Sequence, residues 1–139
     1  MMETRRERFV TTKQFLQSAR SFDITEEECI LEALDNSFDA GARRVRIEIS
    51  KTERDEPLII IIDDGVGIPA RHVDDDGVEH QGIPYVLAYG GRIPHEGKRG
   101  PIGKFGWGLS QAASSISRRT EVYTKTNTDD QWRYCYYDF

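Results

Sequence analysis

Alternation of hydrophobic and polar residues along the chain predicts several strands. Val45–Ile49 alternates apolar with charged residues, which is typical of a strand with one solvated face. Leu58–Ile62 is a continuous apolar run rich in isoleucine, which predicts a strand covered on both faces. Nearer the C-terminus, Thr120–Thr126 and Gln131–Tyr137 read as two strands joined by the polar turn Asn127–Asp130, the pattern of a hairpin.

Residues 25–40 show helical spacing instead. Thr25 and Glu28 have the S/T-x-x-E spacing of a capping box, which predicts the start of a helix. Gly41 supplies the residue type that commonly follows a helix end. The apolar side of this helix is expected to face the core and comprises Ile30, Leu31, Leu34 and Phe38.

The middle of the chain is less regular. Asp74–Gly77 is a polar loop, Tyr85–Tyr89 is compatible with one helical turn, and Gly90–Pro101 is rich in Gly, Pro and charge. Because long loops inside compact domains are often functional, we expect a mobile lid at about residues 70–103. A further helix is expected after it, with core positions at Leu109, Ala112, Ala113 and Ile116.

Composition sets limits on the class of protein. The 139 residues suffice for a single domain, 1–139, and the net charge of −5 does not indicate nucleic-acid binding by this module. No segment has the length and apolar character of a membrane span or signal peptide, so a cytoplasmic or nuclear protein with reduced Cys29 and Cys135 is expected. The three histidines lack metal-ligand spacing and are expected at the surface.

One polar stripe on the predicted helix could carry chemistry. Since a helix turns about 100° per residue, Glu32, Asp35, Asn36 and Asp39 fall on a common face. Three acids and an amide could hold a metal ion and a water molecule. Taken alone, however, the helix is better explained by a solvated charged face.

Two glycine clusters follow the stripe in the sequence. Asp63, Gly65 and Gly67 stand where the apolar strand ends; an aspartate there can accept a hydrogen bond from an exocyclic amine, and glycines let a flat ring approach the backbone. The alternative is a tight turn. A second cluster within residues 103–108 opens a helix, which favours an anion site, with a flexible hinge as its alternative.

The three motifs together resemble those of a known family. Glu32-x-x-x-Asn36-x-x-Asp39-Ala40, Asp63-x-Gly65-x-Gly67 and Gly103-x-x-Gly106-x-Gly108 occur in this order. They are similar to the N box and the two glycine boxes of the GHKL superfamily of gyrase, heat-shock chaperone, histidine kinase and MutL. The segment 102–109 looks closest to the chaperone and MORC branches, and 122–126 resembles the strand that follows there.

The resemblance implies an α+β fold called the Bergerat fold. This fold is a two-layer α/β sandwich with helices on one face of a mixed β-sheet, and ATP lies between the helix layer and a mobile lid. Asn36 is then expected to coordinate Mg²⁺, which bridges the phosphates, and Glu32 to orient and deprotonate the attacking water. Asp63 is expected to accept the adenine amino group.

The remaining positions of the implied site contact the base or the phosphates. Gly67 and Ile68 are expected beside the adenine ring, and the second glycine box around the phosphates, where Lys104 adds a positive charge. The complete set of implied ATP-binding residues is Asn36, Asp39, Ala40, Asp63, Gly65, Gly67, Ile68, Gly103, Lys104, Phe105, Gly106, Trp107, Gly108 and Leu109. Lys98 and Arg99 in the expected lid are weaker phosphate candidates.

Two functional classes remain open from the sequence. The favoured one is the N-terminal ATPase module of a larger, ATP-gated homodimer that binds ATP and ADP with Mg²⁺. The other is a kinase-type or regulatory nucleotide-binding domain without ATPase activity of its own. A further strand that the family usually has after the hairpin finds no match before Phe139, so we expect a fragment or truncated form with weak activity in isolation.

Overall fold

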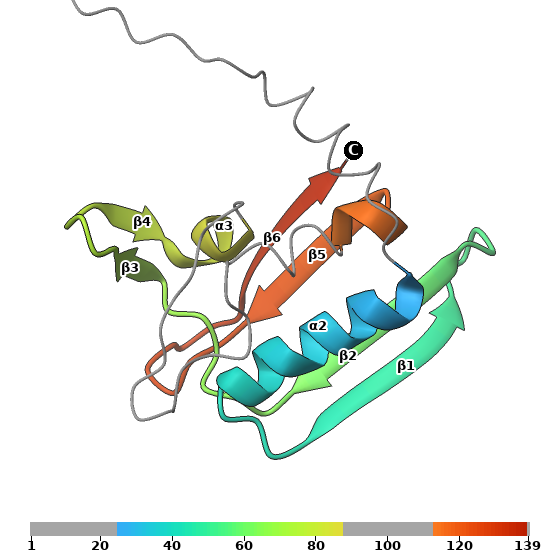
Figure 1. The fold of residues 1–139 in the computed structure, drawn as a ribbon, viewed down its shortest axis with the longest axis horizontal. Coiled ribbons are helices and arrows are strands. Elements are labelled where there is room, and N and C mark those ends of the chain that lie inside the picture. Colours follow the sequence, from blue (N-terminus) through green and yellow to red (C-terminus); the bar gives the residue numbers. More distant parts are fainter. Residues whose placement is uncertain (1–24, 88–112, 139) are drawn as a thin grey trace, which may run out of the picture.

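The computed structural model describes residues 25–87 and 113–138 (Figure 1). Its elements are, in chain order, α2 (Glu26–Asp39), β1 (Val45–Lys51), β2 (Pro57–Asp63), β3 (Arg71–Val73), β4 (Glu79–Gln81), α3 (Gly82–Leu87), β5 (Arg119–Thr124) and β6 (Arg133–Asp138). Residues 113–116 are also helical. The second glycine box and the 88–103 part of the expected lid lie outside the described residues.

Helix α2 begins and ends as its sequence predicts. The Thr25 hydroxyl accepts from the Glu28 backbone N–H at 3.2 Å, and the Glu28 carboxylate accepts from the Thr25 N–H at 2.9 Å. This capping box satisfies two backbone donors that the first turn leaves without helical partners. Gly41, directly after the C-cap Ala40, has φ +78°, which suits glycine best.

The buried face of α2 differs from the predicted one. Leu31 and Phe38 are 58% and 48% exposed, whereas Cys29 and Ser37 are each 5% exposed. The helix is turned so that Ser37 meets the end of β2, where its hydroxyl lies 3.1 Å from the Asp63 carboxylate. Leu31 and Phe38 are therefore not on the buried side of α2.

Strands β1 and β2 form an antiparallel pair in which Val45 lies opposite Asp63. The predicted coverage of β2 on both faces is wrong, because Ile60 and Ile62 are 37% and 48% exposed. The apolar side of β1 is also open at Ile49, which is 74% exposed. Within the described residues β2 pairs with β1 alone, so its other edge has no strand beside it there.

The fold is of the α+β class, as the sequence predicts. Within the described ranges the strands form three antiparallel pairs, β1–β2, β3–β4 and β5–β6. Helix α2 lies over the β1–β2 pair, and the β5–β6 hairpin lies on the other side of α2 in the same view (Figure 1). The predicted C-terminal hairpin is confirmed, with Val122 opposite Cys135.

The segment 70–87, which forms the start of the expected lid, is a small hairpin followed by a helix. Strands β3 and β4 pair with His72 opposite His80, and the turn between them contains Gly77 at φ +79°. Helix α3 contacts β4 and β6, and Ile83 on it is 4% exposed. The predicted helical turn therefore starts three residues earlier than expected, at Gly82.

Both cysteines lie where the sequence places them, and both are thiols. Cys29 is in α2 and Cys135 is in β6. Burial raises the pKa of the Cys29 thiol, and the nearby carboxylates of Glu26 and Glu28 raise it further. Among the described residues, none of the helices is long and apolar enough to span a bilayer.

Candidate functional site

On the polar stripe of α2, the Asn36 amide is bonded to the helix backbone. Nδ2 of Asn36 donates to the backbone carbonyl of Glu32, one turn earlier, at 2.7 Å. Because the amide nitrogen is used in this bond, its oxygen is the group that can meet a cation or a ligand. Asn36 is exposed, and Glu32 is half-buried.

Two neighbouring carboxylates on the stripe act on Glu32. Partial burial raises the pKa of Glu32, and the negative charges of Asp35 and Asp39 raise it further. A carboxyl group whose pKa is shifted toward neutrality is better suited to accept a proton from water than an ordinary glutamate. Asp35 and Asp39 are thus the two carboxylates whose charges act on Glu32.

Asp63 lies at the end of β2 and is held from two sides. Its Oδ1 accepts from the Gly65 N–H at 2.8 Å, and its Oδ2 accepts from the Ser37 hydroxyl at 3.1 Å. The single hydroxyl hydrogen of Ser37 is shared between Asp63 and the Ala33 carbonyl oxygen, which lies 3.0 Å from the hydroxyl oxygen. Since each carboxylate oxygen can accept more than one bond, the exposed Asp63 is oriented and still able to accept from a ligand.

The end of α2 meets the first glycine box directly. The Val66 N–H donates to the Ala40 carbonyl oxygen at 3.0 Å. A Cβ on Gly65 would lie 3.0 Å from that same oxygen and 2.9 Å from Oδ1 of Asp63, so a larger residue has no room. The structure thus brings together Ala40, Asp63 and Gly65, which the sequence predicts as parts of one site.

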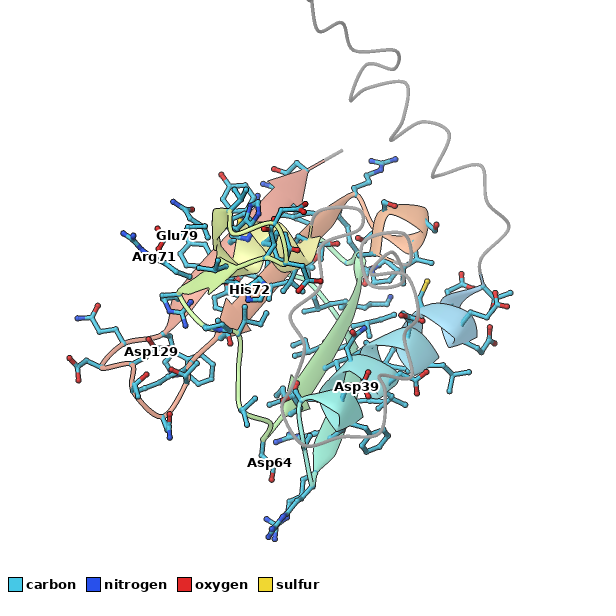
Figure 2. The ribbon with its side chains drawn as sticks, turned by 60° about the vertical axis from the view of Figure 1, so that its left-hand side comes forward. Asp39, Asp64, Arg71, His72, Glu79 and Asp129 are labelled. Atoms are coloured by element: carbon cyan, nitrogen blue, oxygen red, sulfur yellow. The ribbon has the colours of Figure 1, made fainter. Side chains whose placement is uncertain are left out.

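Asp64, directly after Asp63, bonds the loop that follows α2. Its Oδ1 accepts from the backbone N–H groups of Arg43 at 2.7 Å and Arg44 at 2.9 Å. These bonds, with that of Arg44 first in importance, lower the pKa of Asp64. Figure 2 shows Asp64 beyond the end of β2 and Asp39 on the neighbouring helix α2. Asp64 therefore ties the loop after α2 to the turn that carries Asp63.

Gly67 and Ile68 contact the end of β5. Gly67 has φ +77°, and a Cβ there would collide with the backbone carbonyl of Lys125. The Ile68 N–H donates to the hydroxyl of Thr124, a residue only 5% exposed, at 2.8 Å. The first glycine box is therefore positioned by both α2 and the β5–β6 hairpin.

Sequence reasoning missed three residues at this site: Ser37, Thr124 and Arg133. Ser37 lies between two residues of the polar helix motif, and Thr124 lies in the segment 122–126 that resembles the family strand. The positions of Ser37 and Thr124 within these motifs could have identified both residues from the sequence. Arg133, whose Nη2 donates to the Ile68 carbonyl at 2.6 Å, stands in an ordinary strand pattern that contains no such signal.

His72 and His80 form a separate cluster near the acidic loop. His80 bonds Asp74 at 2.7 Å and stacks on Tyr85, and His72 also lies against Tyr85. His72 and His80 are half-buried by these contacts. Figure 2 shows His72 with Arg71 and Glu79 on the β3–β4 pair, apart from Asp39 and Asp64.

Metal-binding capacity is limited in the described part of the chain. There, no group of three or more His, Cys, Asp or Glu side chains could hold a metal ion.

These features define an α+β domain in which an acid-and-amide helix stripe adjoins a glycine turn carrying an exposed, oriented carboxylate. A family model described as histidine kinase-, DNA gyrase B-, and HSP90-like ATPase matches residues 24–138. The chain belongs to this family, the GHKL ATPases, as its three motifs predict. A search of curated proteins found no match. Membership supports ATP binding at the level of the family.

Proposed function

We propose that this chain binds Mg-ATP and hydrolyses it as the ATPase module of a larger, ATP-gated dimeric protein. The observation that carries this proposal is the direct junction between α2 and the first glycine box. Ser37 bonds Asp63 at 3.1 Å, and the Ala40 carbonyl accepts from Val66 at 3.0 Å. The carboxylate proposed to bind adenine and the helix face proposed to support hydrolysis are therefore parts of one continuous site.

Asp63 is proposed to bind the adenine amino group. Its two oxygens are fixed by Gly65 and Ser37, and the carboxylate has further lone pairs toward solvent. Gly67 and Ile68 follow and are proposed to lie beside the adenine ring, while the side-chain position of Gly67 faces the Lys125 carbonyl. Binding to an oriented acceptor carries a smaller entropic cost than binding to a mobile one, because the side chain is already ordered.

Asn36 is proposed to hold Mg²⁺, and its surroundings fit that role. Its amide nitrogen is engaged by Glu32, which leaves a neutral oxygen, a ligand type that Mg²⁺ accepts together with phosphates and water. When bound, the ion would neutralise charge on the phosphates. The predicted phosphate contacts of residues 103–109 belong to the same proposal.

Glu32 is proposed as the general base for water. Its pKa is raised by partial burial and by the charges of Asp35 and Asp39, which favours proton transfer from water near neutral pH. Because Glu32 lies one turn before Asn36 on the same stripe, the base and the cation ligand are neighbours.

The decisive experiment compares phosphate release and protein phosphorylation on radiolabelled ATP. In the wild-type chain or its longer form we expect free phosphate; Glu32→Ala should retain ATP binding and lose about two to four orders of magnitude in hydrolysis. Label transferred to protein instead would favour the kinase-type alternative. Absence of ATP binding in the wild type would overturn the proposal. Light scattering with a non-hydrolysable ATP analogue tests whether bound ATP causes the protein to dimerise.

A further inference from the structure

Both polar backbone groups of Ile68 are bonded by side chains of the β5–β6 hairpin. The Ile68 N–H donates to Thr124 at 2.8 Å, and the Ile68 carbonyl accepts from Nη2 of Arg133 at 2.6 Å. These partners are 56 and 65 positions away in the sequence, so the contacts exist only in the folded chain. Each of the two peptide groups that flank the Ile68 Cα is thus held by one hairpin side chain.

Arg133 is itself fixed by Asp129 in the hairpin turn. The two hydrogens of Nη2 are divided between the Ile68 carbonyl and Oδ2 of Asp129, which lies at 2.7 Å. The side chains are only 27% and 18% exposed, which limits competition from water. Asp129 also accepts from the backbone N–H and the hydroxyl of Thr126, at 2.8 and 2.9 Å. Figure 2 shows Asp129 in this turn.

The arrangement leaves one donor of Arg133 without a partner. Its Nε is buried and makes no hydrogen bond. An unsatisfied buried donor is unfavourable, so the guanidinium is held in place by its bonds to Asp129 and Ile68.

Gly67 makes the same segment sensitive to small displacements. Its positive φ and its close approach to the Lys125 carbonyl leave little space between the glycine turn and β5. The charged pair of Asp129 and Arg133 therefore fixes a segment that has few alternative positions.

We propose that Arg133, held by Asp129, is a positioning residue for nucleotide recognition. By fixing the Ile68 carbonyl it sets the position of Gly67 and Ile68, and with them the surface against which the purine ring of the nucleotide lies. This inference rests on the proposed ATP-binding function, in which the turn that starts at Asp63 binds the base.

The test measures ATP affinity by calorimetry for Arg133→Ala, Arg133→Lys and Asp129→Asn. Loss of a charge-assisted hydrogen bond should weaken ATP binding about tenfold in Arg133→Ala. Arg133→Lys should recover only part of this lost affinity. The lysine keeps the positive charge, but its ammonium cannot reproduce the planar fork of donors of arginine. Affinity for inorganic tripolyphosphate should be unchanged, since that probe lacks the base.

Two controls come from the same hairpin. Arg119→Ala removes an arginine that bonds Glu121 and Asp138 instead of Ile68, and Asp130→Asn removes the exposed neighbour of Asp129. Both should bind ATP like the wild type. The amide resonances of Gly67 and Ile68 should shift in the Arg133 variants and stay unchanged in the controls, which tests positioning without nucleotide.

The outcomes are distinguishable from those of the proposed function. If the wild type binds no ATP, the proposed function and this inference both fail. If the wild type binds ATP and the folded Arg133 variants bind it equally well, only this inference fails. Equal losses for ATP and tripolyphosphate would also overturn it, because they would indicate a general structural effect. Should Arg133→Ala not fold, Arg133→Lys and Asp129→Asn decide the question.

Discussion

The hydroxyl of Ser37 on α2 lies 3.1 Å from Oδ2 of Asp63 at the end of β2. Ser37 is 5% exposed, and this bond joins the helix to the strand at the point where the glycine turn begins. The contact gives a buried serine two functions: it orients the helix and it orients the carboxylate proposed to bind the base.

Ser37→Ala should therefore affect both stability and binding. Loss of the bond is expected to cost about 1 kcal/mol in the free energy of unfolding, measured with urea. ATP affinity should fall as well, by less than in a variant of Asp63 itself, because Gly65 still holds Oδ1. Ser50→Ala, at an exposed position of β1, is the control and should change neither quantity. An unchanged unfolding curve for Ser37→Ala would contradict this role.

Asp63→Asn should weaken ATP binding by about tenfold or more, as measured by calorimetry. The amide has a single acceptor oxygen, whereas Ser37 and Gly65 each require an acceptor and the adenine amine would need another. Its matched control is Asp64→Asn, which alters the adjacent acid that bonds the backbone of Arg43 and Arg44. Equal ATP affinity in wild type and Asp63→Asn would remove Asp63 from base recognition.

The pH dependence of hydrolysis should depend on Asp35. As the base, Glu32 must be ionised, so the rate should fall as pH decreases through its raised pKa. Asp35→Asn removes one charge that raises this pKa, so the acid limb of the pH–rate profile should move to lower pH. Glu27→Gln, at an exposed position in the first turn of α2, should leave the limb in place. A profile that does not move would mean that another group controls the rate.

Asp129 should stabilise the fold in a pH-dependent way. Its bonds from Arg133 and Thr126 lower its pKa from 3.8 to about 2. A lowered carboxyl pKa stabilises the folded state above the unfolded value, and this stabilisation is lost as pH falls toward about 2. Urea unfolding should therefore show a constant difference between wild type and Asp129→Asn from neutral pH to about pH 5, narrowing in more acidic solution. A difference that grows on acidification would refute the assignment.

Gly67 and Gly77 form a natural pair for testing backbone strain. Both have positive φ, +77° and +79°, but a Cβ on Gly67 would meet the Lys125 carbonyl, whereas one on Gly77 would meet nothing within 4 Å. Gly67→Ala should lower the free energy of unfolding by more than about 1 kcal/mol, and by more than Gly77→Ala does. If thermal or urea unfolding gave the same loss of stability for both variants, the contact of the new Cβ with Lys125 would not be destabilising.

Local signals predicted much of the secondary structure. The capping box of Thr25 and Glu28 and the stop at Gly41 depend on residues close in sequence, and the structure reproduces them. The predicted burial of Leu31, Phe38 and the β2 isoleucines is wrong, because burial depends on what packs against an element. A periodic pattern shows which residues share a face but not which face meets a neighbour.

The sequence by itself determined the family, through three motifs whose residue types and order are properties of the chain. It also determined the α+β class and the candidate residues Glu32, Asn36 and Asp63. Only the tertiary structure decided that Ser37 orients Asp63 and that Arg133 holds Ile68, since each bond joins residues 26 or 65 positions apart. Such contacts are set by the packing of α2, β2 and the β5–β6 hairpin, and a linear pattern contains no measure of that packing.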